Sequence, residues 1–170
     1  MKRFWWRHQT SVCRACTVKA GIGALIGIGM IAALGEWTQL PLLIAPFGAT
    51  CALLFLVPES PLSQPANVIG GHLITATVAL VADAVLPGTW WGMALAVGVA
   101  VIAMGLARLV HPPAGANPII VMYSHPGLQF VFMPVLIGAV ALVGLALLIH
   151  RMPPRPVAYP LPVPPDPSTP

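Results

Sequence analysis

The polar residues that could do chemistry gather in two stretches in the middle of the chain. The first stretch is 58–67, followed by Gly-Gly-His at 70–72, and the second is 108–117. Each is associated with a Pro-x-Gly-Ala segment, PFGAT at 46–50 and PAGAN at 113–117. Glycine and alanine after an initiating proline leave the first N–H groups of a helix uncovered, and these groups carry positive partial charge. Two such helix starts predict a site for a small anion that needs no full countercharge.

Side chains near these helix starts complete the predicted site. Thr50 and Asn117 occupy equivalent positions in the two segments, and each could add one hydrogen bond to an anion. His72 stands in an otherwise apolar stretch and is expected to face the interior of a helix bundle, because an imidazole facing apolar surroundings is costly. The predicted substrate-binding residues are Gly48, Ala49, Thr50, His72, Arg108, His111, Gly115, Ala116 and Asn117. The alternative is that Pro-x-Gly-Ala is only a tight helix start that allows close packing.

Two members of this set have open alternatives. Arg108 either attracts the anion electrostatically or marks the end of a helix. His111 could contact the substrate, carry a proton or fix the His-Pro-Pro turn through its ring nitrogens, and the last role is favoured. Glu59 is expected to be a solvated loop acid or a partner of Arg108. Asp83 is expected near the outer interface, with a role in proton coupling as the less favoured alternative.

The sequence contains no recognisable catalytic or metal-binding pattern. It lacks a Ser-His-acid order with a nucleophile elbow, an HExxH motif and the Cys/His spacing of a metal site. We therefore predict no enzymatic activity, no cofactor and no metal; His72 and Glu59 are the one pair that could act as acid and base. Three cysteines give no disulfide framework. Cys13 and Cys16 form a CxxC that reads as two small residues at a helix start, with redox or lipid modification as the alternative.

The composition places these residues in a membrane. Of 170 residues, 58% are hydrophobic and 7% are charged, and the mean hydropathy is +0.88. A soluble domain has roughly a quarter of its residues charged, whereas lipid tails solvate apolar side chains on the outside of a membrane protein. Five of the eight Lys and Arg residues precede the first apolar run. That clustering at the end of a span is typical of a cytoplasmic membrane face and argues against a nucleic-acid partner.

Six apolar stretches follow one another at about 18–36, 40–57, 67–86, 90–107, 113–123 and 130–149. Four are long enough to cross a bilayer, but prolines interrupt the second and the fifth. The order of long, short and long segments occurs twice. If all six cross, every Lys and Arg lies on one face, both termini are cytoplasmic, and a three-helix unit repeated once is inverted. The alternative is four crossings and two re-entrant segments, which would move Arg108 to the other face.

The two ends of the chain differ from this apolar middle. The first apolar stretch also fits a cleaved signal peptide, but a retained span is favoured because more apolar segments follow. The last 18 residues, 153–170, contain nine prolines and are expected to form a disordered extension. We therefore predict a basic cytoplasmic segment at 1–17, a transmembrane domain at 18–150 and a disordered proline-rich tail at 151–170.

Three ordered motifs resemble the HPP family, integral membrane proteins named for their His-Pro-Pro motif. They are PFGAT, VPESPLSQPANVIGGH and HPPAGAN, and the resemblance covers about 20–150. It implies a transporter-like membrane protein, and plastid members of the family are associated with nitrite transport. Some relatives carry an appended regulatory domain, whereas this chain has only its proline-rich tail there.

We therefore expect an all-α, polytopic transmembrane bundle, with two inverted repeats of three helices, in a bacterial plasma (inner) membrane. Its expected function is transport of a small inorganic anion, nitrite by family resemblance. The alternatives are a channel or proton-coupled carrier for another small solute, and a membrane scaffold that transports nothing. The GxxxG motif at 23–27 could pack against a second copy in a homo-oligomer or within the bundle.

Overall fold

The computed structural model describes residues 4–6 and 13–162, and within them every regular element is a helix. The six α-helices are α1 (Arg14–Thr38), α2 (Pro46–Leu56), α3 (Pro65–Val85), α4 (Trp90–Leu106), α5 (Asn117–Ser124) and α6 (Ile137–Arg151). Two short 3₁₀ helices, η1 (Pro61–Ser63) and η2 (Pro112–Ala116), precede α3 and α5. A π-helical segment, η3 (Val131–Leu136), runs directly into α6.

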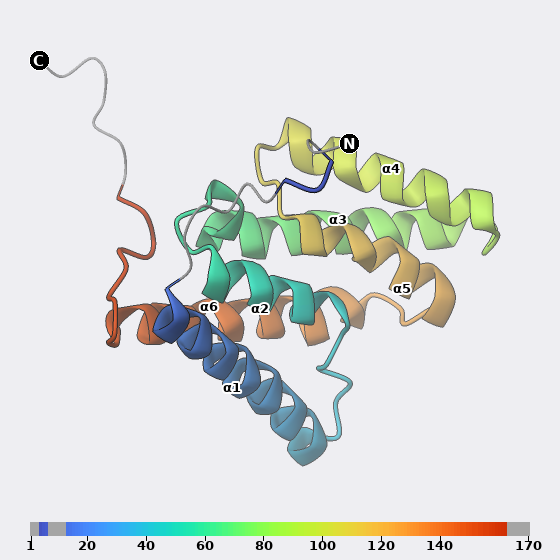
Figure 1. Cartoon of the computed structure of the whole chain (residues 1–170). Coiled ribbons are helices and arrows are strands. Elements are labelled where there is room, and N and C mark those ends of the chain that lie inside the picture. Colours follow the sequence, from blue (N-terminus) through green and yellow to red (C-terminus); the bar gives the residue numbers. More distant parts are fainter. Residues whose placement is uncertain (1–3, 7–12, 163–170) are drawn as a thin grey trace, which may run out of the picture.

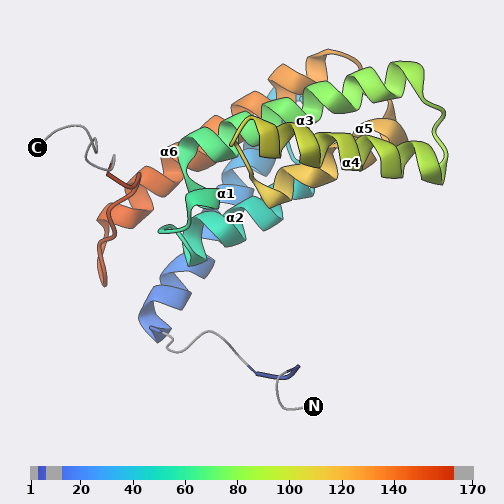
Figure 2. The same ribbon diagram turned by 90° about the horizontal axis from the view of Figure 1, so that it is seen from above.

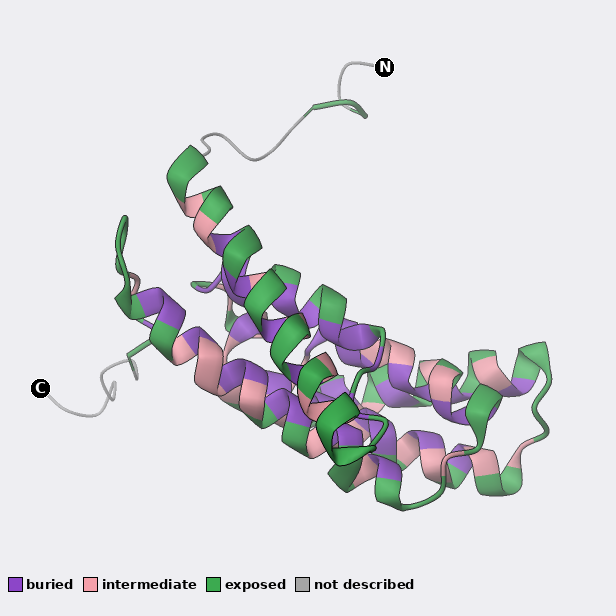
Figure 3. Cartoon of the chain, turned by 90° about the horizontal axis from the view of Figure 1, so that it is seen from below, coloured by how far each residue is buried: buried purple, intermediate pink, exposed green. Residues whose placement is uncertain are grey.

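Three of these helical segments are long and apolar enough to cross a membrane: 14–38, 65–85 and 131–151. Helix α4 is also apolar and has 17 residues, which is close to the length that spans a hydrocarbon core. The outer side of α1 is exposed along its length (Figure 3), and leucine and isoleucine side chains such as Leu25 and Ile22 lie on it. An apolar face without protein cover is expected where lipid is the solvent. The prediction of an all-α integral membrane bundle is confirmed.

Consecutive helices run in alternating directions along the bundle (Figure 1). The second and fifth helices are short, with 11 and 8 residues, as the prolines predicted. Both begin well inside the bundle and run apart toward opposite ends, which is also visible from above (Figure 2). The bundle thus has one end where α1 begins and α6 ends, called here the terminal end, and an opposite end.

The fifth helix begins four residues later than the sequence predicted. We expected it to start at Pro113, but 112–116 form the 3₁₀ helix η2 and the α-helix starts at Asn117. Pro118 has no N–H, so it cannot donate to the carbonyl of Ala114 four residues earlier. The N–H of Asn117 donates to that carbonyl instead, which closes a 3₁₀ turn.

Three α-helices that lack a side-chain cap begin with proline instead. The N-cap residues of α2, α3 and α5 make no side-chain hydrogen bond, and each of these helices has a proline in its first two positions. By contrast, α1 and α4 have no such proline. Their first turns are capped by the Cys13 sulfur and by the Thr89 hydroxyl, respectively.

The described basic residues gather at one end of the bundle, whereas two of the three described acidic residues lie at the other. The Lys and Arg residues that the structure describes are Arg14, Lys19, Arg108, Arg151 and Arg155, and all lie at the terminal end. Glu36 and Asp83, at the last turns of α1 and α3, lie at the opposite end together with Trp37, Trp90 and Trp91. The crossing of all six segments, for which Arg108 was expected on the face of the other basic residues, stays a prediction.

The glycines of the GxxxG motif pack inside the bundle. Gly23 and Gly27 are buried, and a Cβ atom added to them would lie 2.9 Å from Phe55 of α2 and from Leu142 of α6, respectively. These glycines therefore allow α1 to approach its neighbours closely. They are not a free surface for a second copy of the chain.

The start of the proline-rich tail packs against the terminal end and differs from the disordered extension that we expected. Tyr159 is only 6% exposed, and its hydroxyl donates to the carbonyl of Ser63 over 3.0 Å. Burial raises the pKa of this phenol, which keeps it protonated as the donor. The N–H of Leu161 donates to Gln64 Oε1 over 2.9 Å, and Lys19 Nζ donates to the carbonyls of Met152 and Arg155. Residues 163–170 of the predicted tail lie outside the described residues.

Candidate functional site

A cluster of fully buried polar side chains lies where α2, α3 and η2 meet inside the bundle. Its members Thr50, His72, Thr75, His111 and Asn117 each have 0% of their surface exposed. Thr50 is in the second turn of α2, His72 and Thr75 are one turn apart in α3, His111 precedes η2, and Asn117 begins α5. Apolar side chains, among them Phe47 and Val68, make up the surrounding core. A polar cluster in such surroundings must satisfy its hydrogen bonds internally.

The Thr50 hydroxyl joins the two imidazoles of the central cluster. Its oxygen lies 2.9 Å from His72 Nε2 and 3.0 Å from His111 Nε2. The second ring nitrogen of His111, Nδ1, lies 2.8 Å from the carbonyl of Leu62 in η1. The other nitrogen of His72, Nδ1, lies 3.2 Å from the amide nitrogen of Asn117. These four contacts form one chain from Asn117 to Leu62.

With one proton on each imidazole, only one direction satisfies this chain. The Leu62 carbonyl can only accept, so His111 carries its proton on Nδ1 and its Nε2 accepts from the Thr50 hydroxyl. Thr50 has no second proton, so its oxygen accepts from His72 Nε2–H. His72 Nδ1 is then an acceptor for the Asn117 amide. Every donor in the chain therefore points from α5 toward η1.

Asn117 is held by α3 through its amide nitrogen. That nitrogen lies 3.2 Å from the carbonyl of His72 and 2.9 Å from the Thr75 hydroxyl oxygen. Its side-chain oxygen is buried and has no hydrogen-bond partner among the described residues. Exchanging the oxygen and nitrogen would place two acceptors, the Asn117 oxygen and the His72 carbonyl, against each other, so this orientation is the favourable one. An acceptor thus remains unsatisfied beside the chain.

The position of His111 depends on a close approach between α3 and the segment before η2. A Cβ atom on Gly71 would lie 2.7 Å from the Cβ of His111 and 2.9 Å from the carbonyl of Leu109. Only glycine leaves room for the segment at this point of α3. Asn67, one turn earlier, donates to the carbonyl of Val110 over 3.0 Å. These contacts explain how the Gly-Gly-His stretch and the His-Pro-Pro motif come to lie side by side.

The predicted backbone donors at the helix starts are less available than we expected. The N–H groups of Phe47 and Gly48 donate to the carbonyls of Ile44 and Ala45 over 3.0 and 3.1 Å. The chain enters α2 through 3₁₀-type turns, which occupy these donors. Side chains of the cluster, rather than uncovered N–H groups, are therefore the main polar groups at this level of the bundle.

The small residues of the predicted site lie at the edge of the cluster. Gly48 and Ala49 are exposed, and Gly115 and Ala116 are half-buried. A Cβ atom added to Gly48 or Gly115 would have no neighbour within 4 Å, so these positions border open space.

Arg108 lies apart from the cluster. It follows the end of α4 at the terminal end, is exposed, and adopts a left-handed backbone conformation with φ of 56°. Glu59 is exposed at the same end, and no ion pair joins the two among the described residues.

The sequence did not predict four of the interactions seen in the structure. Thr75 could have been found, because it lies three residues after His72 on the same face of a helix. The Leu62 carbonyl carries no sequence signal. Asp83, which we expected near the outer interface, lies 2.7 Å through its Oδ1 from Nδ1 of His125, a partner that the sequence did not indicate. Cys13 and Cys16 form a disulfide, which we had not favoured; the first turn of α1 brings their Cα atoms within 5.1 Å.

Comparisons with known proteins place the chain among transmembrane proteins. A family model described as the transmembrane region of HPP matches residues 9–160. A transmembrane protein of Dictyostelium discoideum is 36% identical over 131 residues, which cover 72% of this chain and 46% of that protein. A second transmembrane protein of the same organism is 33% identical over 117 residues, covering 64% of this chain and 38% of that protein. The chain thus spans less than half the length of these relatives. No solved structure matches it.

Proposed function

Because the chain belongs to the HPP family of transmembrane proteins, we propose that it carries a small inorganic anion, nitrite by family resemblance, across the membrane. The observation that supports this function is the buried polar cluster of Thr50, His72, His111 and Asn117 inside an otherwise apolar bundle. Polar side chains at membrane depth are costly and are found where substrates or protons pass. They come from α2, α3 and the segment that enters α5, so relative movement of these helices would open the cluster.

The anion would take the place of the Thr50 hydroxyl between the two imidazoles. His72 Nε2 donates in the arrangement described above, whereas His111 Nε2 accepts. An anion has only acceptors to offer, so it requires a proton on His111 Nε2 before it can bind there. One proton is therefore taken up with each anion, and the positive charge on His111 balances the anion within the bundle. The positive ends of α2 and α5, which start close to this level, add to the attraction.

The proposed architecture is an inverted repeat. Helices α1–α3 and α4–α6 each follow the order long, short and long, and alternating directions give the second unit the opposite orientation to the first. Both termini are proposed to be cytoplasmic, because the described Lys and Arg residues gather at the terminal end. The proposed location is a bacterial plasma membrane.

Flux into proteoliposomes tests the proposed function. Purified protein would be reconstituted, and uptake of nitrite, nitrate, formate and bicarbonate would be compared with uptake by protein-free liposomes. His72→Gln disturbs the cluster, and His125→Gln makes the same change at the opposite end, where the ring is exposed. We expect flux of at least one anion, faster with an acidic outer buffer, and its loss in His72→Gln alone.

Two other outcomes would favour the alternatives. Flux of a different solute through the same cluster would indicate another channel or carrier. Absence of flux for every solute, with a stable and folded protein, would indicate a scaffold in which the cluster only holds α2, α3 and η2 together.

A further inference from the structure

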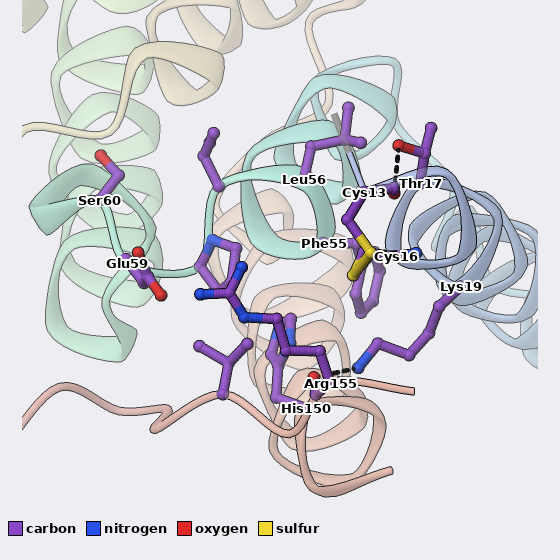
Figure 4. A pocket seen from close by; sticks show the side chains of 13 residues that line it. Cys13, Cys16, Thr17, Lys19, Phe55, Leu56, Glu59, Ser60, His150 and Arg155 are labelled. Carbon is purple, nitrogen blue, oxygen red and sulfur yellow. Dashed lines mark hydrogen bonds between the residues drawn. A yellow bond between two sulfur atoms is a disulfide. The ribbon is translucent and has the colours of Figure 1, made fainter. Parts of the chain in front are cut away.

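A second polar site lies at the terminal end, away from the central cluster. The start of α1, the end of α2, the end of α6 and the tail line an open cavity of about 620 Å³ (Figure 4). Cys13, Cys16 and Lys19 line it from α1, Phe55 and Glu59 line it from α2 and the following loop, and His150 and Arg155 line it from α6 and the tail. None of these residues forms a hydrogen bond with the chain around Thr50, and the proposal for this site does not rest on the proposed transport function.

The charge of the cavity is mainly positive. Lys19 uses two of its three N–H donors on the carbonyls of Met152 and Arg155, at 3.0 and 2.8 Å, and one donor remains. Arg155 is exposed and extends across the cavity from the tail (Figure 4). Among the described residues, neither cation lies within an ion-pair distance of a carboxylate. The start of α1, a helix of 25 residues, also borders the cavity and adds the positive end of its dipole.

His150, whose side chain lines the cavity, identifies the second requirement of a ligand. His150 is 2% exposed, and its Nε2 lies 2.8 Å from the carbonyl of Leu54. A carbonyl only accepts, so this nitrogen carries the proton and Nδ1 is left as a bare acceptor. His150 Nδ1 is buried and has no hydrogen-bond partner among the described residues. The rings of Phe55 and Tyr159, with centroids 6.1 and 5.2 Å away, hold the imidazole in this orientation.

The ligand must therefore present anionic oxygens to Lys19 and Arg155 and a hydroxyl donor to His150. We propose that the cavity binds inorganic phosphate or a phosphate monoester. Inorganic phosphate carries oxyanions and a P–OH group at neutral pH, and a monoester carries both in its monoanion, which loses its proton with a pKa of about 6. The fork of an arginine guanidinium matches two phosphate oxygens. Sulfate and phosphate diesters have the same tetrahedral shape but no acidic hydroxyl, so they cannot satisfy His150 Nδ1. A soluble phosphate and the monoester headgroup of phosphatidic acid share the required chemistry.

Binding measurements can separate these ligands. The full chain would be reconstituted into phosphatidylcholine nanodiscs and titrated with inorganic phosphate, glycerol 3-phosphate, dimethyl phosphate and sulfate at constant ionic strength. Thermal stability and calorimetry would serve as readouts. We expect saturable binding of the first two and at least about tenfold weaker binding of the diester and sulfate, because these lack the donor. A second set of nanodiscs, containing phosphatidic acid or phosphatidylglycerol, tests whether the source is a lipid.

Three variants test which residues of the cavity bind phosphate. Arg155→Gln should weaken phosphate binding about tenfold, since it removes a charge-assisted contact, whereas Arg151→Gln removes a nearby charge that does not line the cavity and should not. His150→Gln retains a donor for Leu54 but no acceptor at the Nδ1 position, so it should remove the preference for phosphate over sulfate. Equal binding of phosphate and sulfate to the unmodified protein would overturn the proposal. Absence of saturable binding in both sets of nanodiscs, or equal effects of Arg155→Gln and Arg151→Gln, would also overturn it.

Discussion

Replacing the Thr50 hydroxyl by a methyl group tests whether one oxygen atom holds the central cluster together. Thr50→Val keeps the shape of the side chain but removes the partner of His72 Nε2–H and of His111 Nε2. Two nitrogen atoms at 2.9 and 3.0 Å from the same oxygen are at most 5.9 Å apart, the sum of these distances. Unless α3 or the segment before η2 moves so that His72 Nε2–H donates directly to His111 Nε2, both nitrogens lose their partner.

The structure sets the size of the expected effect. Leaving one buried polar group unsatisfied costs about 1–3 kcal/mol, so two such groups cost about 2–6 kcal/mol. Side-chain hydrogen bonds in membrane proteins average about 0.6 kcal/mol each, which gives about 1 kcal/mol for two if the unfolded chain finds other partners. Because the cluster is fully buried, we expect Thr50→Val to destabilise the fold by at least about 2 kcal/mol. Thr50→Ser keeps the hydroxyl and loses one methyl group, worth about 1 kcal/mol.

The assay is equilibrium unfolding of both variants in mixed micelles by titration with dodecyl sulfate, followed by circular dichroism. Nitrogen-15 spectra of labelled histidine provide a second readout. In the unmodified protein we expect a proton on His72 Nε2 and on His111 Nδ1, with a hydrogen-bonded signal from each ring. If Thr50→Val is as stable as Thr50→Ser and the imidazole signals do not change, the Thr50 hydroxyl does not join the two rings and the directional chain is refuted.

Other predictions follow from the surroundings of the cluster. Gly48→Ala should leave the free energy of unfolding unchanged or raise it by up to about 1 kcal/mol, because the new methyl group meets nothing within 4 Å. The same substitution should slow anion flux into proteoliposomes, whereas Gly98→Ala, on the exposed side of α4, should not. Arg108→Gln should lower the initial rate of uptake at low salt and have little effect at high salt, because a charge outside the cluster acts by steering; loss of flux at every salt concentration would instead place Arg108 in the site. Tyr159→Phe should cost about 1 kcal/mol in unfolding assays and speed proteolysis of the tail; unchanged cleavage would contradict the docked tail.

The sequence predicted the helices and much of the central cluster, because both depend on local patterns. Apolar runs interrupted by proline indicated two short helices. The shared Pro-x-Gly-Ala motif singled out Thr50 and Asn117, which both lie in the cluster, although Thr50 is in the second turn of α2 and Asn117 is the first residue of α5. His72 was expected to face the interior because an imidazole inside an apolar helix has few other favourable orientations. The order of donors and acceptors could not be predicted, since it depends on the Leu62 carbonyl, and carbonyls are present at every position.

The tail and the terminal cavity could not be predicted because their contacts join distant parts of the chain. Residues 153–162, the described part of the proline-rich segment, form no helix or strand. The prolines do not exclude docking, because an extended segment can bind through the backbone carbonyls that Lys19 reaches and through one buried ring, Tyr159. His150 likewise meets a carbonyl 96 residues away in sequence. No local pattern contains that information.

The prolines at the starts of α2, α3 and α5 also lower the number of backbone N–H groups that need an acceptor inside this bundle. The first N–H groups of a helix have no acceptor within the helix, and inside a membrane there is no water to receive them. Where a helix begins beside a polar cap, as α1 and α4 do, a sulfur or a hydroxyl accepts one of these donors. Where no such side chain is present, proline deletes one donor altogether. Proline, which breaks the interior of a helix, therefore helps a helix to begin inside the membrane, because the helix start then has one unsatisfied N–H group fewer.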